Sequence, residues 1–228
     1  MDSMSSNIPE TEWRPIVIFD LDGTLLNTIA DLGEACNHAL ATYGYPQHAL
    51  DEYPHLVGNG VNKLIERALP EGSKDETIVL QLREAFVPYY NTHNCVHTHP
   101  YEGIPELLQS LKQRGYRLAV ASNKYQAATA QLVNHFFPNT FDIVYGERPN
   151  VPRKPDPQIV FDILSALTDI PASTPIYYVG DSLVDITTAH NAHLPVFACT
   201  WGFCAESDLV AASPEYLVHH PSEILALV

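Results

Sequence analysis

Residues 16–24, Ile-Val-Ile-Phe-Asp-Leu-Asp-Gly-Thr, constrain the fold of this chain more than any other stretch. The apolar run predicts a strand buried on both faces, and Gly23 predicts the turn that ends it. Alternation along a strand would point Asp20 and Asp22 the same way, at the edge where open α/β sheets bind ligands. Two close carboxylates need a divalent cation or a shared proton. An acidic turn without function is the alternative interpretation.

The length and charge of the chain limit what it can be. Its 228 residues suffice for one large domain or a domain with a smaller insert. With 46% hydrophobic and 17% charged residues, the composition is typical of a globular protein. The formal net charge of −15 disfavours nucleic acid and anionic membrane surfaces as partners. An anionic substrate would therefore need a metal or a basic group at its site.

The N-terminal residues and the cysteines favour a cytoplasmic protein. Residues 1–11 are polar, carry Asp2 and Glu10, and lack the basic and apolar regions of a secretory signal. No apolar run approaches membrane-spanning length. The four cysteines form no C-x-x-C pair, and we expect reduced thiols.

Hydrophobic periodicity predicts a fold in two parts. Residues 29–40, 61–69 and 74–90 have helical spacing, and residues 91–100 interrupt it. From Tyr101 onward helices alternate with apolar strands. The predicted helices are 104–113, 126–136 and 158–167, and the predicted strands are 117–123, 141–145, 175–180, 195–200 and 216–218. Such alternation indicates a parallel sheet covered on both faces.

The predicted architecture is therefore α/β, with a Rossmann-like parallel sheet as core and a helical cap domain inserted after the first strand. We assign residues 1–30 and 99–228 to the core and residues 31–98 to the cap. The oligomeric state expected is a monomer or a homodimer.

Polar side chains follow several of these strands at their carboxyl ends, and such ends meet at one edge of a parallel sheet. The set comprises an acid pair, a hydroxyl with an amide, a further acid, and a lysine in the loop 148–157. These are Asp20, Asp22, Ser122, Asn123, Asp181 and Lys154. Carboxylates suit Mg²⁺, whereas a lysine and neutral donors suit a phosphate.

Four segments in this order resemble the four motifs of the haloacid dehalogenase (HAD) superfamily, and the resemblance covers nearly the whole chain. The segments are Asp20-Leu21-Asp22-Gly23-Thr24, Ser122-Asn123, Lys154-Pro155-Asp156-Pro157, and Gly180-Asp181-Ser182 through Asp185. Within the superfamily, residues 56–69 resemble the cap segment of phosphoglycolate phosphatases, where Gly58 and Asn59 would touch substrate.

The resemblance implies a role for each motif residue. Asp20 would be the nucleophile that forms an aspartyl-phosphate, and Asp22 the general acid and base. Magnesium would be held by Asp20, by Asp22 through its backbone carbonyl and by Asp181, with Asp185 as second-shell support. Thr24, Ser122 and Asn123 would contact substrate, and Lys154 would neutralise charge on nucleophile and phosphate.

The expected activity is hydrolysis of a small phosphorylated metabolite, with 2-phosphoglycolate as leading candidate. A phosphomutase resembling β-phosphoglucomutase, a pyrophosphatase and a catalytically silent binding module on the same fold are alternatives. A dehalogenase would need neither magnesium nor the acid at Asp22.

Two further features depart from this pattern. His193 stands where similar phosphatases carry glycine, and we expect it to pack beside the site. His93, His97 and His99 cluster where the chain returns to the core. His97 and His99 could ligate zinc, but with no acid or cysteine expected nearby we interpret the segment as a polar loop.

Overall fold

The computed structural model describes residues 14–228. Residues 1–13 of the predicted core segment 1–30, and with them the polar N-terminal stretch, lie outside the described residues.

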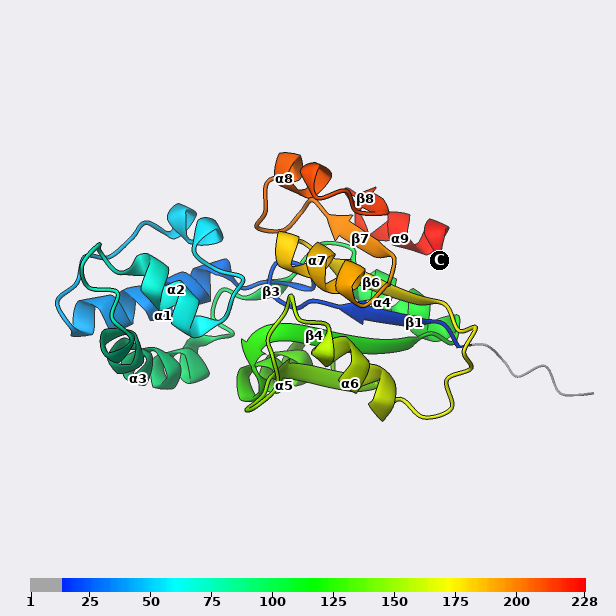
Figure 1. Ribbon diagram of the computed structural model, residues 1–228, viewed down its shortest axis with the longest axis horizontal. Helices are drawn as coiled ribbons and strands as arrows, with labels where there is room; N and C mark the ends of the chain where they lie inside the picture. Colours follow the sequence, from blue (N-terminus) through cyan, green and yellow to red (C-terminus); the bar gives the residue numbers. More distant parts are fainter. Residues whose placement is uncertain (1–13) are drawn as a thin grey trace, which may run out of the picture.

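The described chain forms a six-stranded sheet, a two-stranded ribbon and a series of helices (Figure 1). The strands are β1 (Ile16–Phe19), β2 (Leu26–Asn27), β3 (His99–Pro100), β4 (Arg117–Tyr125), β5 (Ile143–Glu147), β6 (Ile176–Gly180), β7 (Val196–Cys199) and β8 (Tyr216–Val218). The helices are α1 (Ile29–Thr42), the 3₁₀ helix η1 (Leu50–His55), α2 (Val61–Ala68), α3 (Glu76–His93), α4 (Ile104–Gln113), α5 (Gln126–Phe136), α6 (Gln158–Ala166), α7 (Leu183–Asn191), α8 (Glu206–Ala211) and α9 (Pro221–Leu227).

The large sheet is parallel throughout and has the order β5-β4-β1-β6-β7-β8. The central strand β1 is buried on both faces, as its unbroken apolar sequence predicts. Val17 and Phe19 join a cluster with α4, α5 and α9, whereas Ile16 and Ile18 join a cluster with α6, α7 and α8. The alternation of side chains along one strand thus supplies the core of both layers.

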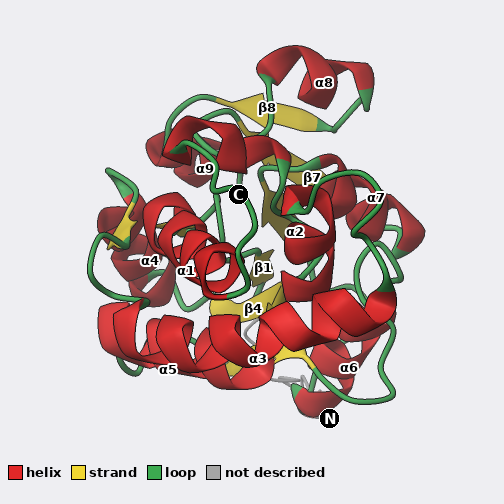
Figure 2. Ribbon diagram, turned by 90° about the vertical axis from the view of Figure 1, so that its left-hand side faces the viewer, coloured by secondary structure: helices red, strands yellow, loops and turns green. Residues whose placement is uncertain are grey.

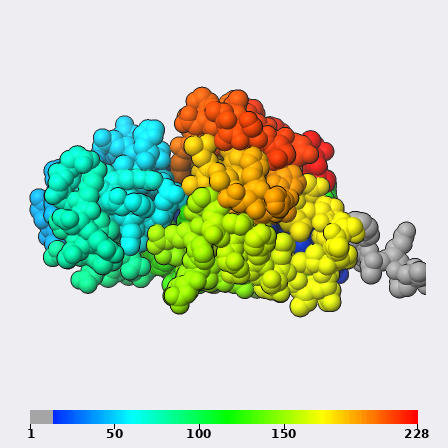
Figure 3. Space-filling model, in the orientation of Figure 1, coloured from blue at the N-terminus to red at the C-terminus, as the bar shows by residue number. Residues whose placement is uncertain are grey.

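Helices α1, α2 and α3 form the cap, with a hydrophobic cluster of their own (Figure 1). The large buried side chains of this cluster include Leu40, Tyr53, Leu82 and Phe86. Viewed from the cap side, these helices stand in front of the sheet (Figure 2), and in the space-filling view the cap abuts the core (Figure 3). The chain enters and leaves the cap through β2 and β3, which pair antiparallel.

The α/β class, the parallel sheet and the inserted helical cap are confirmed. The predicted strands and helices all occur, with shifts of a few residues at their ends. The third cap helix continues to His93, so this histidine ends a helix and is not part of the predicted loop. Helix α7 and the short elements β2, β3, η1, α8 and α9 were not predicted. No helix within residues 14–228 combines the length and apolar character that a membrane span requires.

Candidate active site

A cavity of about 360 Å³ lies between the cap and the carboxyl ends of the strands. Its core wall includes Asp20, Asp22, Ser122, Asn123, Lys124, Asp181 and Ser182. Its cap wall includes Leu32, Val57, Gly58, Asn59, Gly60, Val61, Leu64, Phe86 and Tyr90. The acids and the lysine that line the cavity lie on the core wall, which also has apolar side chains such as Leu183 and Phe203, whereas the cap wall is mostly apolar. The two domains therefore contribute different chemistry to one space.

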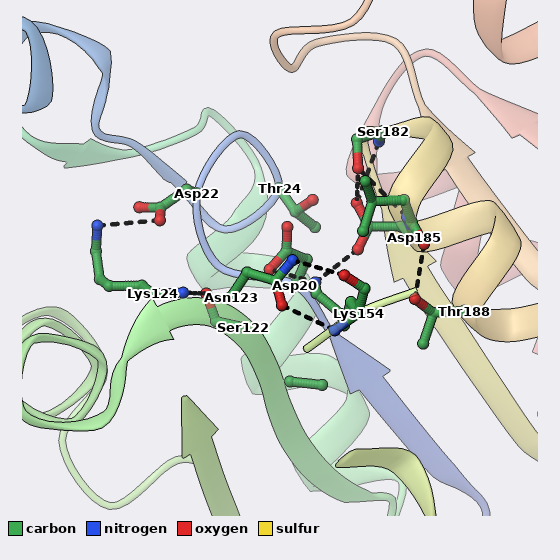
Figure 4. Close-up of polar contacts among 12 residues, drawn as sticks. Asp20, Asp22, Thr24, Ser122, Asn123, Lys124, Lys154, Ser182, Asp185 and Thr188 are labelled. Atoms are coloured by element: carbon green, nitrogen blue, oxygen red, sulfur yellow. Dashed lines mark hydrogen bonds and ion pairs between the residues drawn. The ribbon is translucent and has the colours of Figure 1, made fainter. Parts of the chain in front are cut away.

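Asp20 lies directly after β1, and its carboxylate is paired with Lys154 from the loop before α6 (Figure 4). Lys154 Nζ lies 2.9 Å from Asp20 Oδ1 and 2.7 Å from Asp185 Oδ1. Burial and the charge of Asp185 raise the pKa of Asp20 to about 7, although Lys154 opposes this. Burial alone would lower the pKa of Lys154, but Asp185 and Asp20 outweigh it and raise that pKa well above its ordinary value.

Asp181 follows β6 and is fixed by two donors. Thr24 Oγ1 donates to Asp181 Oδ1 at 3.0 Å, and the backbone N–H of Phe203 donates to Oδ2 at 2.8 Å. Gly23, whose φ is +87°, and Gly202 both approach this carboxylate so closely that a Cβ at either position would collide with it. Burial, together with the charges of Asp185 and Asp20, raises the pKa of Asp181 well above its ordinary value.

Asp185 is fully buried on the first turn of α7 and uses both oxygens within the protein. Oδ1 accepts from Lys154 Nζ and, at 3.2 Å, from the hydroxyl of Tyr178. Oδ2 accepts from Ser182 Oγ at 2.5 Å and from the Ser182 backbone N–H at 3.2 Å. Ser182 and Asp185 thereby form the capping box that starts α7. Asp185 holds Lys154 in place from behind Asp20.

This donor set fits a divalent cation. One carboxylate oxygen from each of Asp20, Asp181 and Asp185 lies within 4.8 Å of the others. The Oδ1 atom of Asp20 is buried and accepts no well-directed hydrogen bond from the described residues, although it contacts Lys154. Four acids and two lysines meet here, which leaves two negative charges in excess if all are ionised. Buried carboxylates in such excess are stabilised by a hard cation such as Mg²⁺.

Asp22 lies in the turn after β1, which ends at Phe19, so the two aspartates are not neighbours on one regular strand. Asp22 Oδ1 accepts from Thr28 Oγ1 at 2.7 Å, and Oδ2 lies 3.0 Å from Lys124 Nζ. Both aspartates nevertheless line the same cavity. Figure 4 shows Asp22 on the side of Lys124, and Asp20 on the side of Lys154.

Ser122 and Asn123 lie near the end of β4, where the pairing register with β5 shifts. Asn123 connects three parts of the site: Nδ2 donates to Lys154 O at 3.1 Å and to Gly58 O at 3.2 Å, and Oδ1 accepts from Lys154 N at 2.9 Å. Asn59 also lines the cavity, but its side-chain oxygen accepts from Arg67 Nη2 at 2.6 Å. The structure therefore brings Gly58 and Asn59 to the core residues.

Thr24 differs from this group. Its hydroxyl is used by Asp181, and it is not among the described residues that line the cavity. We therefore propose that Thr24 supports Asp181, in place of the substrate contact expected from the sequence.

Sequence reasoning missed Lys124, Tyr178 and Tyr90. Lys124 directly follows Ser122-Asn123, which was the available signal. Tyr178 lies in an apolar strand and Tyr90 in an amphipathic helix, so both are indistinguishable from core residues by pattern.

Two expectations about histidines are wrong. His193 is exposed beyond the end of α7 with a φ of 56°, so it does not pack beside the site. Acids do lie near His97: Glu34 Oε1 is 3.4 Å from Nε2, and Asp31 is close as well. The Asp31 carboxylate, however, accepts the backbone N–H groups of residues 96–98 and the hydroxyl of Thr98. It fixes the return segment of the cap.

Known proteins resemble this chain over most of its length. A phosphoglycolate phosphatase from Agrobacterium fabrum is 35% identical, with 90% of this chain and 88% of that protein covered. One from Aquifex aeolicus is 28% identical, with 93% and 96% covered. The crystal structure of a predicted phosphoglycolate phosphatase from Haemophilus somnus has a TM-score of 0.85 at 28% identity, covering 94% of this chain and 97% of that one.

The family model described as haloacid dehalogenase-like hydrolase matches residues 17–199, which include all four motifs and the cap. This chain therefore belongs to the haloacid dehalogenase-like hydrolases.

Proposed function

We propose that this protein is a magnesium-dependent phosphatase that hydrolyses a small phosphorylated metabolite, with 2-phosphoglycolate as the leading substrate. The observation that carries the proposal is the Asp20 carboxylate beside Lys154, in a cavity closed on one side by the cap. The names of the curated relatives support the choice of substrate.

Phosphate monoesters hydrolyse very slowly without help, so the protein must supply a nucleophile, charge neutralisation and proton transfer together. Asp20 attacks phosphorus; an oxygen–phosphorus bond forms to its carboxylate while the bond to the leaving alcohol breaks. Asp22 donates a proton to the departing oxygen. Water then attacks the aspartyl-phosphate, Asp22 takes the water proton, and Asp20 is released with inorganic phosphate.

The remaining residues hold charge and position. Asp20, Asp181 and the backbone carbonyl of Asp22 would hold Mg²⁺, with Asp185 supporting the site. When bound, the ion would offset the negative charge of phosphate and carboxylates. Lys154, held by Asp185, neutralises the same region from the protein side. Ser122 Oγ and the Asn123 backbone N–H would donate to phosphate oxygens.

The cap side of the cavity limits which esters can enter. Gly58 O accepts from Asn123 Nδ2, so the cap loop lies directly over the phosphate-binding residues. A cap in this position excludes bulk water from a covalent intermediate that water would otherwise reach freely. The mostly apolar cap wall offers little to compete for the phosphate, which is therefore directed to the core wall.

A panel of phosphate esters ranked by kcat/KM, with Mg²⁺ and with EDTA, tests the proposal. The panel includes 2-phosphoglycolate, sugar phosphates, nucleotides and pyrophosphate. We expect 2-phosphoglycolate to rank first and EDTA to abolish turnover. Dependence on an added sugar bisphosphate would instead indicate a phosphomutase, and no Mg²⁺-dependent hydrolysis of any ester would reject the enzyme.

The nucleophile is tested by Asp20→Asn, which should lower kcat by about 1,000-fold or more. Asp51→Asn is the matched control, because Asp51 is an exposed cap acid. Substantial Mg²⁺-dependent turnover by the Asp20 variant would contradict the assignment.

A further inference from the structure

Lys124 is a buried cation that the reaction scheme above does not use. It belongs to the core, at the end of β4, and its side chain is 4% exposed. Its Nζ lies 3.0 Å from Asp22 Oδ2 and 4.7 Å from the centre of the Tyr90 ring, which belongs to cap helix α3. Lys124 therefore connects the proposed general acid to the cap, at the wall of the cavity.

Tyr90 provides a second, independent observation at the same place. The residue is fully buried and lines the cavity, and its hydroxyl has no hydrogen-bond partner among residues 14–228. Buried tyrosine hydroxyls normally find a partner, since an unpaired one loses the hydrogen bond that water would have given. An unpaired buried hydroxyl, on a ring whose face an ammonium group contacts, indicates a place for a group rich in acceptor atoms.

The charges around the cavity narrow the nature of that group. Among the described residues that line it, Lys124 is the one lysine or arginine, whereas Asp20, Asp22, Asp181 and Asp208 are acids. Elsewhere along the wall, a second negative group on the substrate would meet acids, apolar side chains, the neutral polar side chains of Asn59, Ser122, Asn123 and Ser182, or His55 of the cap. Among these lining residues, an ammonium group and an unpaired buried hydroxyl are found together at the corner formed by Lys124 and Tyr90, which makes it the most favourable place for a negative group.

We propose that Lys124 and Tyr90 form a subsite for a carboxylate carried by the substrate on the carbon next to the ester oxygen, which makes them specificity-determining residues. The inference rests on the proposed function, because that function places the ester oxygen against Asp22. A carboxylate two bonds from this oxygen then falls near Lys124 Nζ, which is already 3.0 Å from Asp22. The ammonium group has three donors, so it can bond Asp22 and the carboxylate together.

The test compares 2-phosphoglycolate with 2-hydroxyethyl phosphate, which has the same length and a neutral hydroxymethyl group in place of the carboxylate. Lys124→Met should reduce the preference for 2-phosphoglycolate, as a ratio of kcat/KM values, by about 10- to 100-fold, mainly through KM. Tyr90→Phe, which keeps the ring, should reduce it by a few-fold. Lys63→Met, a change at an exposed cap lysine, should leave the ratio as it is.

An equal loss on both esters in Lys124→Met and Tyr90→Phe would overturn the subsite, and would mean that Lys124 acts only by holding Asp22. If Lys124→Met does not fold, as judged by circular dichroism, Tyr90→Phe and Lys124→Arg decide by the same ratio. Lys124→Arg keeps the charge and should retain most of the preference for 2-phosphoglycolate. If Lys124→Arg loses as much of this preference as is expected for a neutral residue, about 10- to 100-fold, the result counts against the subsite.

A binding measurement separates this inference from the proposed function. In Asp20→Asn, calorimetry should give a Kd for 2-phosphoglycolate that rises about 10-fold or more when Lys124→Met is added. If the wild-type protein hydrolyses neither ester but this rise is found, the proposed function fails and the subsite stands. If the Kd does not change, the subsite is refuted whatever the activity.

Discussion

The raised pKa of Asp20 predicts an unusual dependence of stability on pH in the metal-free protein. Its pKa is about 7 in the folded state against an ordinary value of 3.8. Between these values the folded chain keeps a proton that the unfolded chain has lost, so the free energy of unfolding falls as pH rises. Each pH unit in this window costs about 1.4 kcal/mol, so from pH 5 to pH 8 the loss is about 2 to 3 kcal/mol.

Asp20→Asn removes this contribution, because asparagine cannot ionise. Loss of the Asp20 charge also lowers the raised pKa of Asp181, which changes the dependence on pH in the same direction. The free energy of unfolding is measured for both proteins with urea in EDTA, at pH 5 and at pH 8. The difference between the variant and the wild type should increase in favour of the variant by about 2 to 3 kcal/mol from pH 5 to pH 8. Mg²⁺ should restore wild-type stability at pH 8 in proportion to its binding. If the two proteins differ in free energy of unfolding by the same amount at both pH values, the reasoning is refuted. Asp20 would then have the same pKa in the folded and the unfolded state.

Three further predictions follow from single contacts. Gly202→Ala should displace Asp181, because the new Cβ collides with that carboxylate, and should raise the Mg²⁺ concentration for half-maximal activity by about 10-fold or more; an unchanged Mg²⁺ requirement would contradict it. His193→Gly should relieve a left-handed residue and raise the free energy of unfolding by about 0.5 to 1 kcal/mol, seen as a higher urea midpoint at equal slope. Asp31→Asn should lower stability by about 2 to 3 kcal/mol and speed hydrogen exchange of residues 96–98, whose N–H groups it accepts; protection equal to wild type would reject that role.

Much of this fold follows from local sequence. The run 16–19 predicts a strand buried on both faces because alternate residues must each find a covering layer, and the structure supplies one on either side. The strands after Tyr101 were predicted for the same reason. Strands β2 and β3 have two residues each, too few for any periodicity, and they exist because the cap brings their backbones together.

The candidate site likewise has residues that the local sequence predicts and contacts that it does not. Asp20, Asp181 and Lys154 were expected to meet because each follows a strand or borders that edge, and Asp185 was expected beside them from the family resemblance. The structure brings all four together. The partnership of Lys124 with Asp22 and Tyr90 joins residues that are distant in sequence, across the cap and the core. No local pattern encodes it. His193 is the opposite case. It departs from the glycine that similar phosphatases carry at this position, but the structure shows that it affects only a local turn after α7 and not the candidate site.

The paired strands β2 and β3 mean that the cap begins and ends at neighbouring points of the core. An insertion whose two ends already touch makes little demand on the length or shape of what lies between them. The same sheet edge could therefore accept a cap of different size without repacking the layers beneath it. Evolution of new substrate preferences in this chain can proceed by exchanging or remodelling that one insert while the hydrolytic apparatus stays fixed.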